Sequence, residues 1–250
     1  FLEYLEIEKN RSQKTVRNYD FYLRRFLSWF GDKTPEKITA DDVRQYRLWL
    51  NRLQDAHGEP LKKNTQNYHL IALRSFLKYL AKQDIKALAP EKIELMKMPD
   101  REVSFLESSD LNRLLEAPLD YARGKPQQNK AKNNGELIKY RDKAILEMLF
   151  STGLRVSELV SLKKDNLNLS CEEFTVTGKG RKTRVVFLSE QAKYWLKKYL
   201  AARQDLNPYL FISHDLKAAK AKKDQKAEPL TTRSVERIVQ KYARAAGITK

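Results

Sequence analysis

The feature of this chain that most constrains its fold is a pair of segments in its second half. Residues 151–162, STGLRVSELVSL, place Arg155 just after a break that contains glycine, and Glu158 follows three residues later. Side chains at this spacing share one face of a helix. Residues 175–189, TVTGKGRKTRVVFLS, predict two short strands around a Gly-Lys-Gly turn, with Lys179 at the tip of the hairpin. The pair predicts a mainly α protein with a small antiparallel β element.

These residue types suit phosphoryl chemistry on a polyanion. An arginine can bind a phosphate through two parallel hydrogen bonds, a carboxylate can hold that arginine in orientation, and a mobile ammonium can reach a leaving oxygen. In the order Thr-Gly-Leu-Arg-x-x-Glu-Leu followed by Gly-Lys-Gly, the chain resembles the tyrosine recombinase/integrase family, and its Xer-type members in particular. The resemblance covers essentially the whole chain.

The resemblance implies a role for each site residue. Arg155 would hold the non-bridging oxygens of the scissile phosphate and stabilise the transition state, and Glu158 would orient this arginine. Lys179 would be the general acid toward the departing 5′ oxygen, with Lys182 as the competing candidate. The simpler interpretations are a surface arginine, an ordinary helical pair and a solvated basic turn. Further contacts to the DNA backbone are predicted for Arg181, Lys182 and Arg184 in the hairpin and, as an accessory contact, for Arg233 at the start of a final helix.

The resemblance has one gap. In the family, an His-x-x-Arg box, a further His or Trp and a nucleophilic Tyr follow the lysine. Here none of His57, His69 and His214 has an arginine three positions later, and all twelve tyrosines lie at or before Tyr242. We therefore expect a fragment of a longer recombinase, with a catalytic domain that is incomplete at its C-terminus. Such a fragment would bind DNA but lack the nucleophile.

The charge of the chain makes nucleic acid its leading partner. The 250 residues include 49 Lys and Arg against 32 Asp and Glu, which gives a net charge of +17. Residues 1–98 hold 19 basic and 13 acidic residues, and residues 99–250 hold 30 and 19, so both parts are positive. We expect both to bind one duplex of double-stranded DNA. The alternative is a protein that is basic without binding nucleic acid.

Other function classes find no support in the sequence. No apolar run is long enough to span a membrane, and no signal peptide is visible, so we expect no membrane partner and a cytoplasmic location. The single Cys171 excludes an internal disulfide and a Cys-rich zinc site. Isolated histidines, scattered carboxylates and the lack of a Gly-rich phosphate loop predict neither a metal nor a nucleotide cofactor.

The sequence predicts two domains. Residues 1–98 read as helical and, by the resemblance, as a four-helix core-binding domain that contacts DNA. Residues 99–250 read as the α+β catalytic domain, and residues 95–104 read as a connector in which helical periodicity lapses. Predicted helices run from Ser12 to Phe30, from a Thr39–Asp42 capping box, from an Asn64 cap with Tyr68, Ile71, Leu77 and Leu80 inward, from Ser108 or Ser109, over 137–152, from Ser189 to about Arg203, and from Thr232. Residues 121–136 and the Lys-rich 215–229 read as loops.

Two groups of polar side chains in the first domain are candidate DNA contacts. A helix N-terminus with lysines and small polar side chains is a good phosphate contact, although any one such residue is more often merely solvated. The candidates are Lys14, Arg17, Arg24 and Arg25 on the first helix and Lys62, Lys63, Asn64, Thr65 and Gln66 at the start of the third.

The function that the resemblance implies is site-specific DNA strand exchange through a 3′-phosphotyrosine link and a Holliday junction, by a tetramer on two duplexes. One alternative is a non-catalytic, integrase-like DNA-binding module or regulator. A second is a generic RNA or DNA binder in which the Arg and Lys motifs are coincidental. The target site and the biological role stay open, because chromosome-dimer resolution, phage integration and transposition use the same chemistry.

Overall fold

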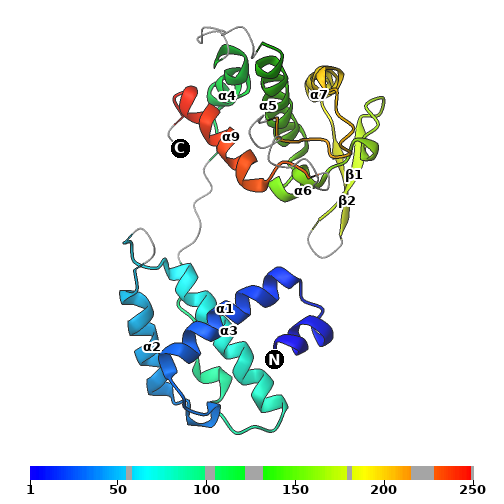
Figure 1. Cartoon of the computed structure of the whole chain (residues 1–250). Helices are drawn as coiled ribbons and strands as arrows, with labels where there is room; N and C mark the ends of the chain where they lie inside the picture. The colour runs from blue at the N-terminus through cyan, green and yellow to red at the C-terminus, as the bar shows by residue number, and fades with distance from the viewer. Residues whose placement is uncertain (55–57, 99–104, 122–131, 179–181, 215–227, 249–250) are drawn as a thin grey trace. The chain divides into compact units, whose positions relative to one another are not determined.

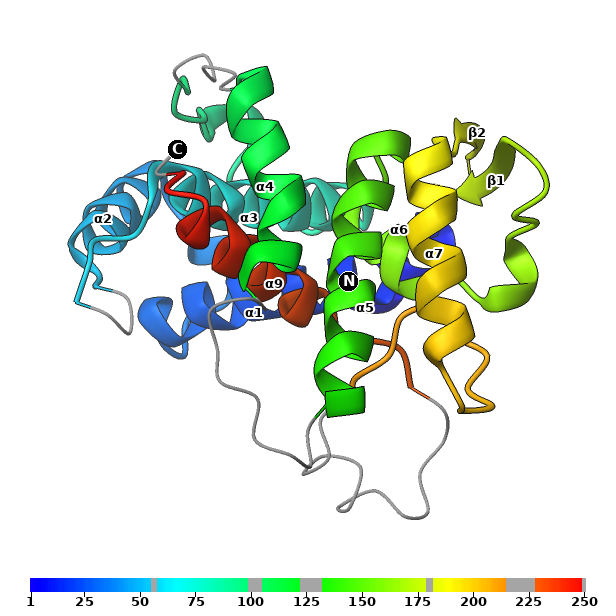
Figure 2. The same ribbon diagram turned by 90° about the horizontal axis from the view of Figure 1, so that it is seen from above.

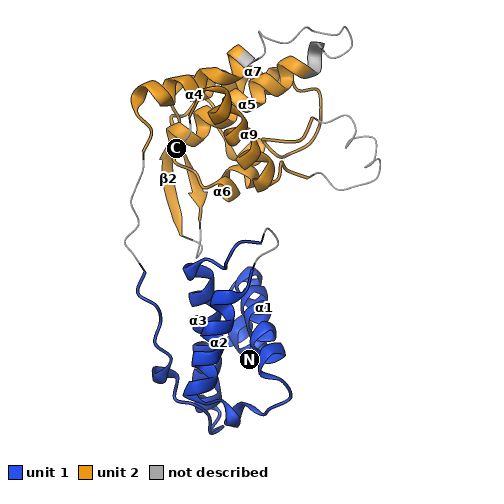
Figure 3. Ribbon diagram, turned by 90° about the vertical axis from the view of Figure 1, so that its left-hand side faces the viewer, with its two compact units in different colours: residues 1–102 blue, residues 103–250 orange. Residues whose placement is uncertain are grey.

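The computed structural model describes residues 1–54, 58–98, 105–121, 132–178, 182–214 and 228–248; the side chains of residues 121 and 132–134 are excepted. The chain forms two compact units, Phe1–Glu102 and Val103–Lys250 (Figures 1 and 3). The predicted domain limits, 1–98 and 99–250, stay a prediction, because residues 99–104 lie outside the described part of the chain.

Unit 1 is helical. α1 packs against α3, and α2 contacts both of them (Figure 1). A π-helical turn precedes α1, and two short 3₁₀ turns follow α1 and α3. The bounds are Tyr4–Glu8 for the π-helical turn, Gln13–Phe30 for α1, Ala40–Arg52 for α2, Lys63–Lys82 for α3, and Pro35–Lys37 and Pro90–Lys92 for the 3₁₀ turns.

The first two helices begin and end close to the predicted residues, and Ser12 adds an N-cap that was not among the predictions. The Ser12 hydroxyl accepts a hydrogen bond from the backbone of Thr15, and α1 stops at Gly31, whose φ of 78° suits glycine. Before α2, the Thr39 N–H donates to Oδ2 of Asp42 at 2.9 Å, and the Asp42 N–H donates to the Thr39 hydroxyl at 3.1 Å. This reciprocal pair is the predicted capping box.

Two predicted features of α3 are wrong. The residue before the helix is Lys62, which makes no side-chain cap, so Asn64 lies inside the first turn. Tyr68 is 53% exposed and does not face inward. The buried stripe runs through Leu70, Leu73, Leu77 and Leu80, and Tyr68, two residues before its start, falls on the opposite face.

Unit 2 is a set of helices with one hairpin on its side. α5 lies between α4 and α7, and α9 packs against α4 and α6 (Figure 2). α5 begins five residues before the predicted 137, with Asn and Gly in its first turn. The helices are α4 Ser108–Tyr121, α5 Lys132–Thr152, α6 Val156–Ser161, α7 Glu190–Ala202 and α9 Thr232–Ala245, with a 3₁₀ turn at Lys164–Asn166. The predicted starts of α7 and α9 are confirmed, with hydroxyl caps from Ser189 and Thr231.

The predicted hairpin is present. β1, Glu173–Thr177, pairs antiparallel with β2, Thr183–Phe187. Val176 and Val186 are buried in the core of unit 2, while the other strand positions are exposed or half-buried. One hydroxyl joins the hairpin to the helices: Ser151 Oγ at the end of α5 donates to the carbonyl of Phe187 at 3.0 Å and accepts from the backbone of Ser189 at 2.7 Å.

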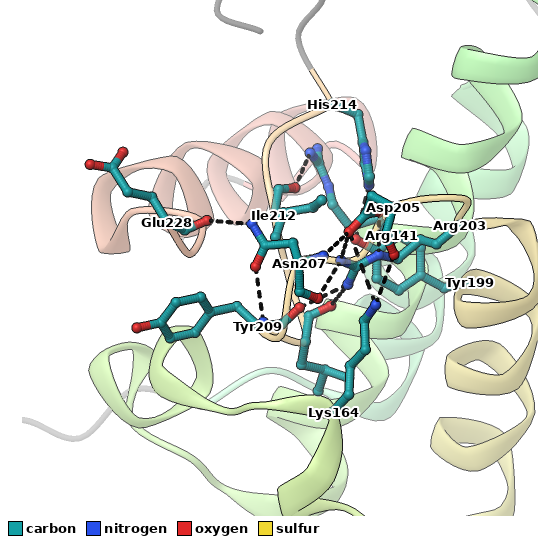
Figure 4. Close-up of polar contacts among 11 residues, drawn as sticks. Arg141, Lys164, Tyr199, Arg203, Asp205, Asn207, Tyr209, Ile212, His214 and Glu228 are labelled. Atoms are coloured by element: carbon teal, nitrogen blue, oxygen red, sulfur yellow. Dashed lines mark hydrogen bonds and ion pairs between the residues drawn. The ribbon is translucent and has the colours of Figure 1, made fainter. Parts of the chain in front are cut away.

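The segment after α7 is held by a buried arginine (Figure 4). Nη1 of Arg203 donates to the carbonyls of Tyr209 and Leu210 at 2.8 and 2.7 Å, and its Nε donates to Asp205 at 2.8 Å. Arg141 of α5 donates to the next part of the segment, at the Ile212 carbonyl. These bonds place the apolar run 210–212 in the core. The Lys-rich loop predicted at 215–229 lies almost wholly outside the described residues.

Candidate functional site

Glu158 is the centre of the candidate site. α6 begins directly after Arg155, which is its N-cap residue, and Glu158 is the third residue of the helix. The Arg155 N–H donates to Oε2 of Glu158 at 2.9 Å, and Nη1 of Arg155 donates to Oε1 at 3.0 Å. The predicted pairing is therefore present, but Arg155 lies at the helix cap and not on a helical face, because a spacing of three also joins an N-cap to N3.

A second arginine reaches the same carboxylate from the hairpin. Arg184 of β2 donates from Nη1 to Oε1 of Glu158 at 3.0 Å and from Nη2 to Oε2 at 2.7 Å. This two-pronged geometry is the strong form of an arginine–carboxylate pair. The carboxylate thus accepts four hydrogen bonds from two arginines. The predicted contact of Arg184 with the DNA backbone stays a prediction, and its guanidinium is engaged in this ion pair.

Arg155, Glu158 and Arg184 form a cluster, the Glu158 cluster, whose members differ in burial and charge. The Glu158 side chain is 8% exposed, whereas that of Arg155 is 64% exposed. Hydrogen bonds from Arg184 lower the pKa of Glu158 to about 2, with burial opposing and the bonds from Arg155 assisting. Two guanidinium ions against one carboxylate leave the cluster positive. An anchored but open arginine in such a cluster is suited to bind a phosphate.

The hairpin backbone closes on the same cluster at Gly178. A Cβ atom on this residue would lie 2.9 Å from Oε1 of Glu158 and 3.5 Å from Nη1 of Arg155, so the approach requires glycine. The Gly178 N–H donates to the carbonyl of Lys182 at 2.9 Å. Lys182 is exposed. The other predicted hairpin residues, Lys179 and Arg181, lie outside the described residues.

The predicted basic face of α1 is at the surface of unit 1. Lys14, Arg17 and Arg24 are exposed, and their spacing places them on one side of the helix. Arg24 pairs with Asp20 at 2.8 Å. Arg25 is half-buried: its guanidinium lies 4.6 Å from the centre of the Phe21 ring.

The start of α3 divides the second predicted group. Lys62, Lys63 and Asn64 are exposed, and Thr65 is half-buried. Gln66 is 5% exposed, and its Nε2 donates to the Leu61 carbonyl at 2.8 Å and to Asn51 at 3.2 Å. Because its amide is bonded within the unit, Gln66 belongs to the packing of unit 1 and not to its surface.

Sequence reasoning missed two exposed aromatic side chains beside this face. Phe21 and Tyr68 are 52% and 53% exposed, and the ring of Tyr22 stacks on that of Tyr68 at 6.4 Å between centroids. His69 joins α1 to α3, since its Nε2 lies 3.4 Å from Nη1 of Arg25. The available signal was the position of Tyr68 opposite the leucine stripe. A hollow of about 520 Å³ adjoins the arginines and is lined by Phe21, Arg24, Arg25, Ser28, Trp29 and Trp49.

Arg233 is exposed in the first turn of α9, which packs against α6. Within the described residues, no group of three or more His, Cys, Asp or Glu side chains could hold a metal ion. No helix in that part of the chain is long and apolar enough to cross a membrane.

Comparison with known proteins supplies two family matches and many relatives. Residues 105–250 match the phage integrase family, and residues 1–84 match the phage integrase, N-terminal SAM-like domain. The chain is 31% identical to tyrosine recombinase XerD of Chlorobaculum tepidum over 255 residues, which cover 100% of this chain and 76% of that protein. It is also 31% identical to tyrosine recombinase XerC of Thermodesulfovibrio yellowstonii, over 99% of this chain and 75% of that protein.

Solved structures share the fold. The XerH site-specific recombinase bound to its difH substrate matches 97% of this chain and 66% of its own, with a TM-score of 0.66 and 18% identity. A lambda integrase tetramer bound to a Holliday junction matches 100% of this chain and 65% of its own, with a TM-score of 0.65 and 18% identity. At these identities the likeness shows the arrangement of helices and hairpin.

Proposed function

The chain belongs to the phage integrase family, as a tyrosine recombinase of the Xer type, and from this premise we propose that it cuts and rejoins double-stranded DNA at specific sites. A tyrosine oxygen attacks the scissile phosphorus, a 3′-phosphotyrosine bond forms, and the bond to the 5′ oxygen breaks. The 5′ hydroxyl of a partner strand then reverses these steps. The observation that carries the proposal is the open guanidinium of Arg155, fixed by the buried carboxylate of Glu158.

In this reaction Arg155 binds the non-bridging oxygens of the phosphate. Charge accumulates on these oxygens in the transition state, so a fixed cation beside them lowers the barrier more than it strengthens binding. Lys179 gives a proton to the departing 5′ oxygen, which lysine can do because its proton is transferable, unlike that of arginine. Lys182 is the other hairpin lysine that can take this role.

Both units bind the DNA in this proposal. Unit 1 contributes the basic face of α1 and the first turn of α3, with the exposed rings of Phe21 and Tyr68 beside them. The excess of basic residues on both sides of the connector supports a shared duplex. The DNA complexes formed by the XerH recombinase and lambda integrase support the same assignment, and the lambda integrase tetramer supports assembly of four copies on a junction. We place the reaction in the cytoplasm.

The test is covalent attachment to a selected site. Duplexes that bind residues 1–250 are first selected from a random pool. The natural full-length protein is then incubated with a nicked duplex of the selected sequence, from which the cleaved end diffuses away. A denaturation-resistant adduct through a tyrosine supports the recombinase, whereas specific binding with no adduct supports a non-catalytic module. Equal binding to all pool sequences contradicts both.

A further inference from the structure

We propose that Arg184 is a positioning residue for Arg155: it acts through Glu158 to hold the phosphate-binding guanidinium in place, and it does not itself contact DNA. This role rests on the proposed recombinase function. It follows from a single geometric fact, that both oxygens of the Glu158 carboxylate are each shared between Arg184 and Arg155.

Arg184 sets the orientation of Arg155 through the carboxylate that both of them bind. The Arg155 side chain is largely exposed, and a free arginine side chain samples many rotamers. Within the described residues, the hydrogen bond that holds the Arg155 side chain goes to Oε1 of Glu158. The plane of that carboxylate is set by two parallel bonds from Arg184, at 3.0 and 2.7 Å, because a planar guanidinium fixes the rotation of its partner. A change at Arg184 therefore reaches Arg155 without a direct contact between them.

Arg184 also sets the net charge beside the phosphate-binding arginine. A carboxylate next to a phosphate-binding arginine competes with the phosphate for it and repels the phosphate itself. Arg184 neutralises Glu158, so that the cluster keeps one net positive charge for the substrate. Without Arg184, the remaining pair would be neutral, and Glu158 would hold Arg155 at the expense of the phosphate.

The hairpin is joined to α6 at the same carboxylate. Arg184 lies on β2, and Gly178 lies just beyond the end of β1. A Cβ atom added to Gly178 would lie 2.9 Å from Oε1 of Glu158 and 3.3 Å from Nη1 of Arg184, so the backbone here is packed against both side chains. The hairpin and α6 are therefore joined through one carboxylate. The position of Arg155 relative to the hairpin is fixed by this junction.

The experiment uses the natural full-length protein and measures single-turnover cleavage at saturating protein, together with the Kd for the same duplex. Arg184→Met should slow cleavage about 10²-fold, the size of effect expected from a small misplacement at a reacting centre, and should change Kd less than about 3-fold. Arg184→Lys keeps the positive charge but cannot make the two parallel hydrogen bonds, and it should slow cleavage about 10-fold. The matched control is Arg113→Met, which removes an exposed arginine paired with Asp110 on α4 and should leave both quantities unchanged.

A variant cycle tests whether Arg184 acts through Glu158. In a Glu158→Gln background, Arg184→Met should slow cleavage by less than about 2-fold, since the partner is already lost. Titration of the Glu158 carboxyl by ¹³C NMR in residues 1–250 gives an independent readout: Arg184→Met should raise its pKa by more than 1 unit, and Arg113→Met should not.

Several results would overturn the role. If Arg184→Met raises the Kd but leaves the cleavage rate at saturating protein unchanged, Arg184 is a DNA contact. An equal slowing by Arg184→Met in both backgrounds excludes action through Glu158, and an unchanged pKa excludes the pairing itself. If Arg184→Met does not fold, the Arg184→Lys rate and its cycle with Glu158→Gln decide alone. A wild-type protein that forms no adduct overturns the proposed function and this role together, whereas cleavage at the wild-type rate by Arg184→Met overturns only the role.

Discussion

The hydroxyl of Tyr242 donates a hydrogen bond to Oδ2 of Asp142 at 2.9 Å and so joins α9 to α5. The tyrosine is 2% exposed, and Asp142 also accepts two bonds from Arg141. Loss of the hydroxyl would leave a buried carboxylate oxygen with one donor fewer.

Tyr242→Phe should therefore lower the free energy of unfolding of unit 2 by about 1.5–3 kcal/mol, the usual contribution of a hydrogen bond to a charged group. Urea unfolding followed by circular dichroism measures this. Tyr140→Phe, which keeps the ring packed against Trp195, is the control and should cost less. Equal losses in the two variants would contradict the role of the hydroxyl.

Neither Tyr46 nor Tyr199 should form a covalent adduct with DNA. Tyr46 and Tyr199 are fully buried, and the hydroxyl of Tyr199 is bonded to His214 at 2.9 Å. Burial raises the pKa of Tyr199 to about 12, which disfavours the nucleophilic anion. Incubation of the protein with a nicked duplex of the selected site, followed by denaturation and peptide mapping, should show no adduct at either residue. An adduct mapped to Tyr46 or Tyr199 would contradict their role in packing.

DNA binding should weaken steeply with salt. Each phosphate contact releases counterions, so a protein with six or more contacts loses about 10³-fold in affinity or more between 50 and 200 mM salt. Arg17→Ala and Lys63→Ala should each reduce the slope of log affinity against log salt concentration by about 0.9, the value for one phosphate contact, and Gln66→Ala should leave the slope unchanged. Fluorescence anisotropy over a salt series measures the slope. An affinity independent of salt would rule out a phosphate-dominated interface, and tight binding by either unit alone would rule out shared binding.

Arg155→Ala in the full-length protein should abolish cleavage while sparing most of the affinity, because one phosphate contact is lost but the transition state is no longer stabilised. Lys179→Ala should also be slow, but a sulfur at the bridging 5′ position should restore its rate, since such a leaving group needs little protonation. Rescue of Lys182→Ala in place of Lys179→Ala would transfer the general acid to Lys182.

The Glu158 cluster should make unit 2 sensitive to acid. The pKa of Glu158 falls from its usual 4.5 to about 2 on folding, so the unfolded chain takes up a proton at a higher pH than the folded one. The stabilisation is therefore complete above about pH 4.5 and is lost as the pH falls toward 2. Thermal melts should show a smaller loss of stability across this range for Glu158→Gln than for the wild type. Parallel curves would contradict the contribution of this carboxyl.

Sequence patterns predicted the features that depend on neighbouring residues. The Thr39 capping box, the stop at Gly31 and the two strands of the hairpin all follow from spacings of a few residues. The Arg155–Glu158 pair was predictable for the same reason. The prediction that Tyr68 of α3 faces inward was wrong because a tyrosine among leucines was taken as apolar, although its position places it opposite the leucine stripe.

The remaining part of the site depends on contacts between distant residues. The bond from Arg184 to Glu158 spans 26 positions, and nothing in the hairpin sequence distinguishes Arg184 from Lys182 as the residue that turns inward. Burial of Gln66 similarly depends on Asn51 of α2, fifteen residues away. Residue type alone makes all of these side chains candidates for DNA, and only the packing divides them.

The Ser151 hydroxyl has a consequence for how such a chain tolerates changes in length. It bonds the carbonyl that ends β2 and the N–H of Ser189, the cap of α7, so three elements meet at one atom. Only three residues separate Ser151 from Arg155, and an insertion there would shift Arg155 and Glu158 together relative to Arg184 on β2. The length of the path from Ser151 to Arg155 therefore sets whether the carboxylate of Glu158 lies within reach of the hairpin.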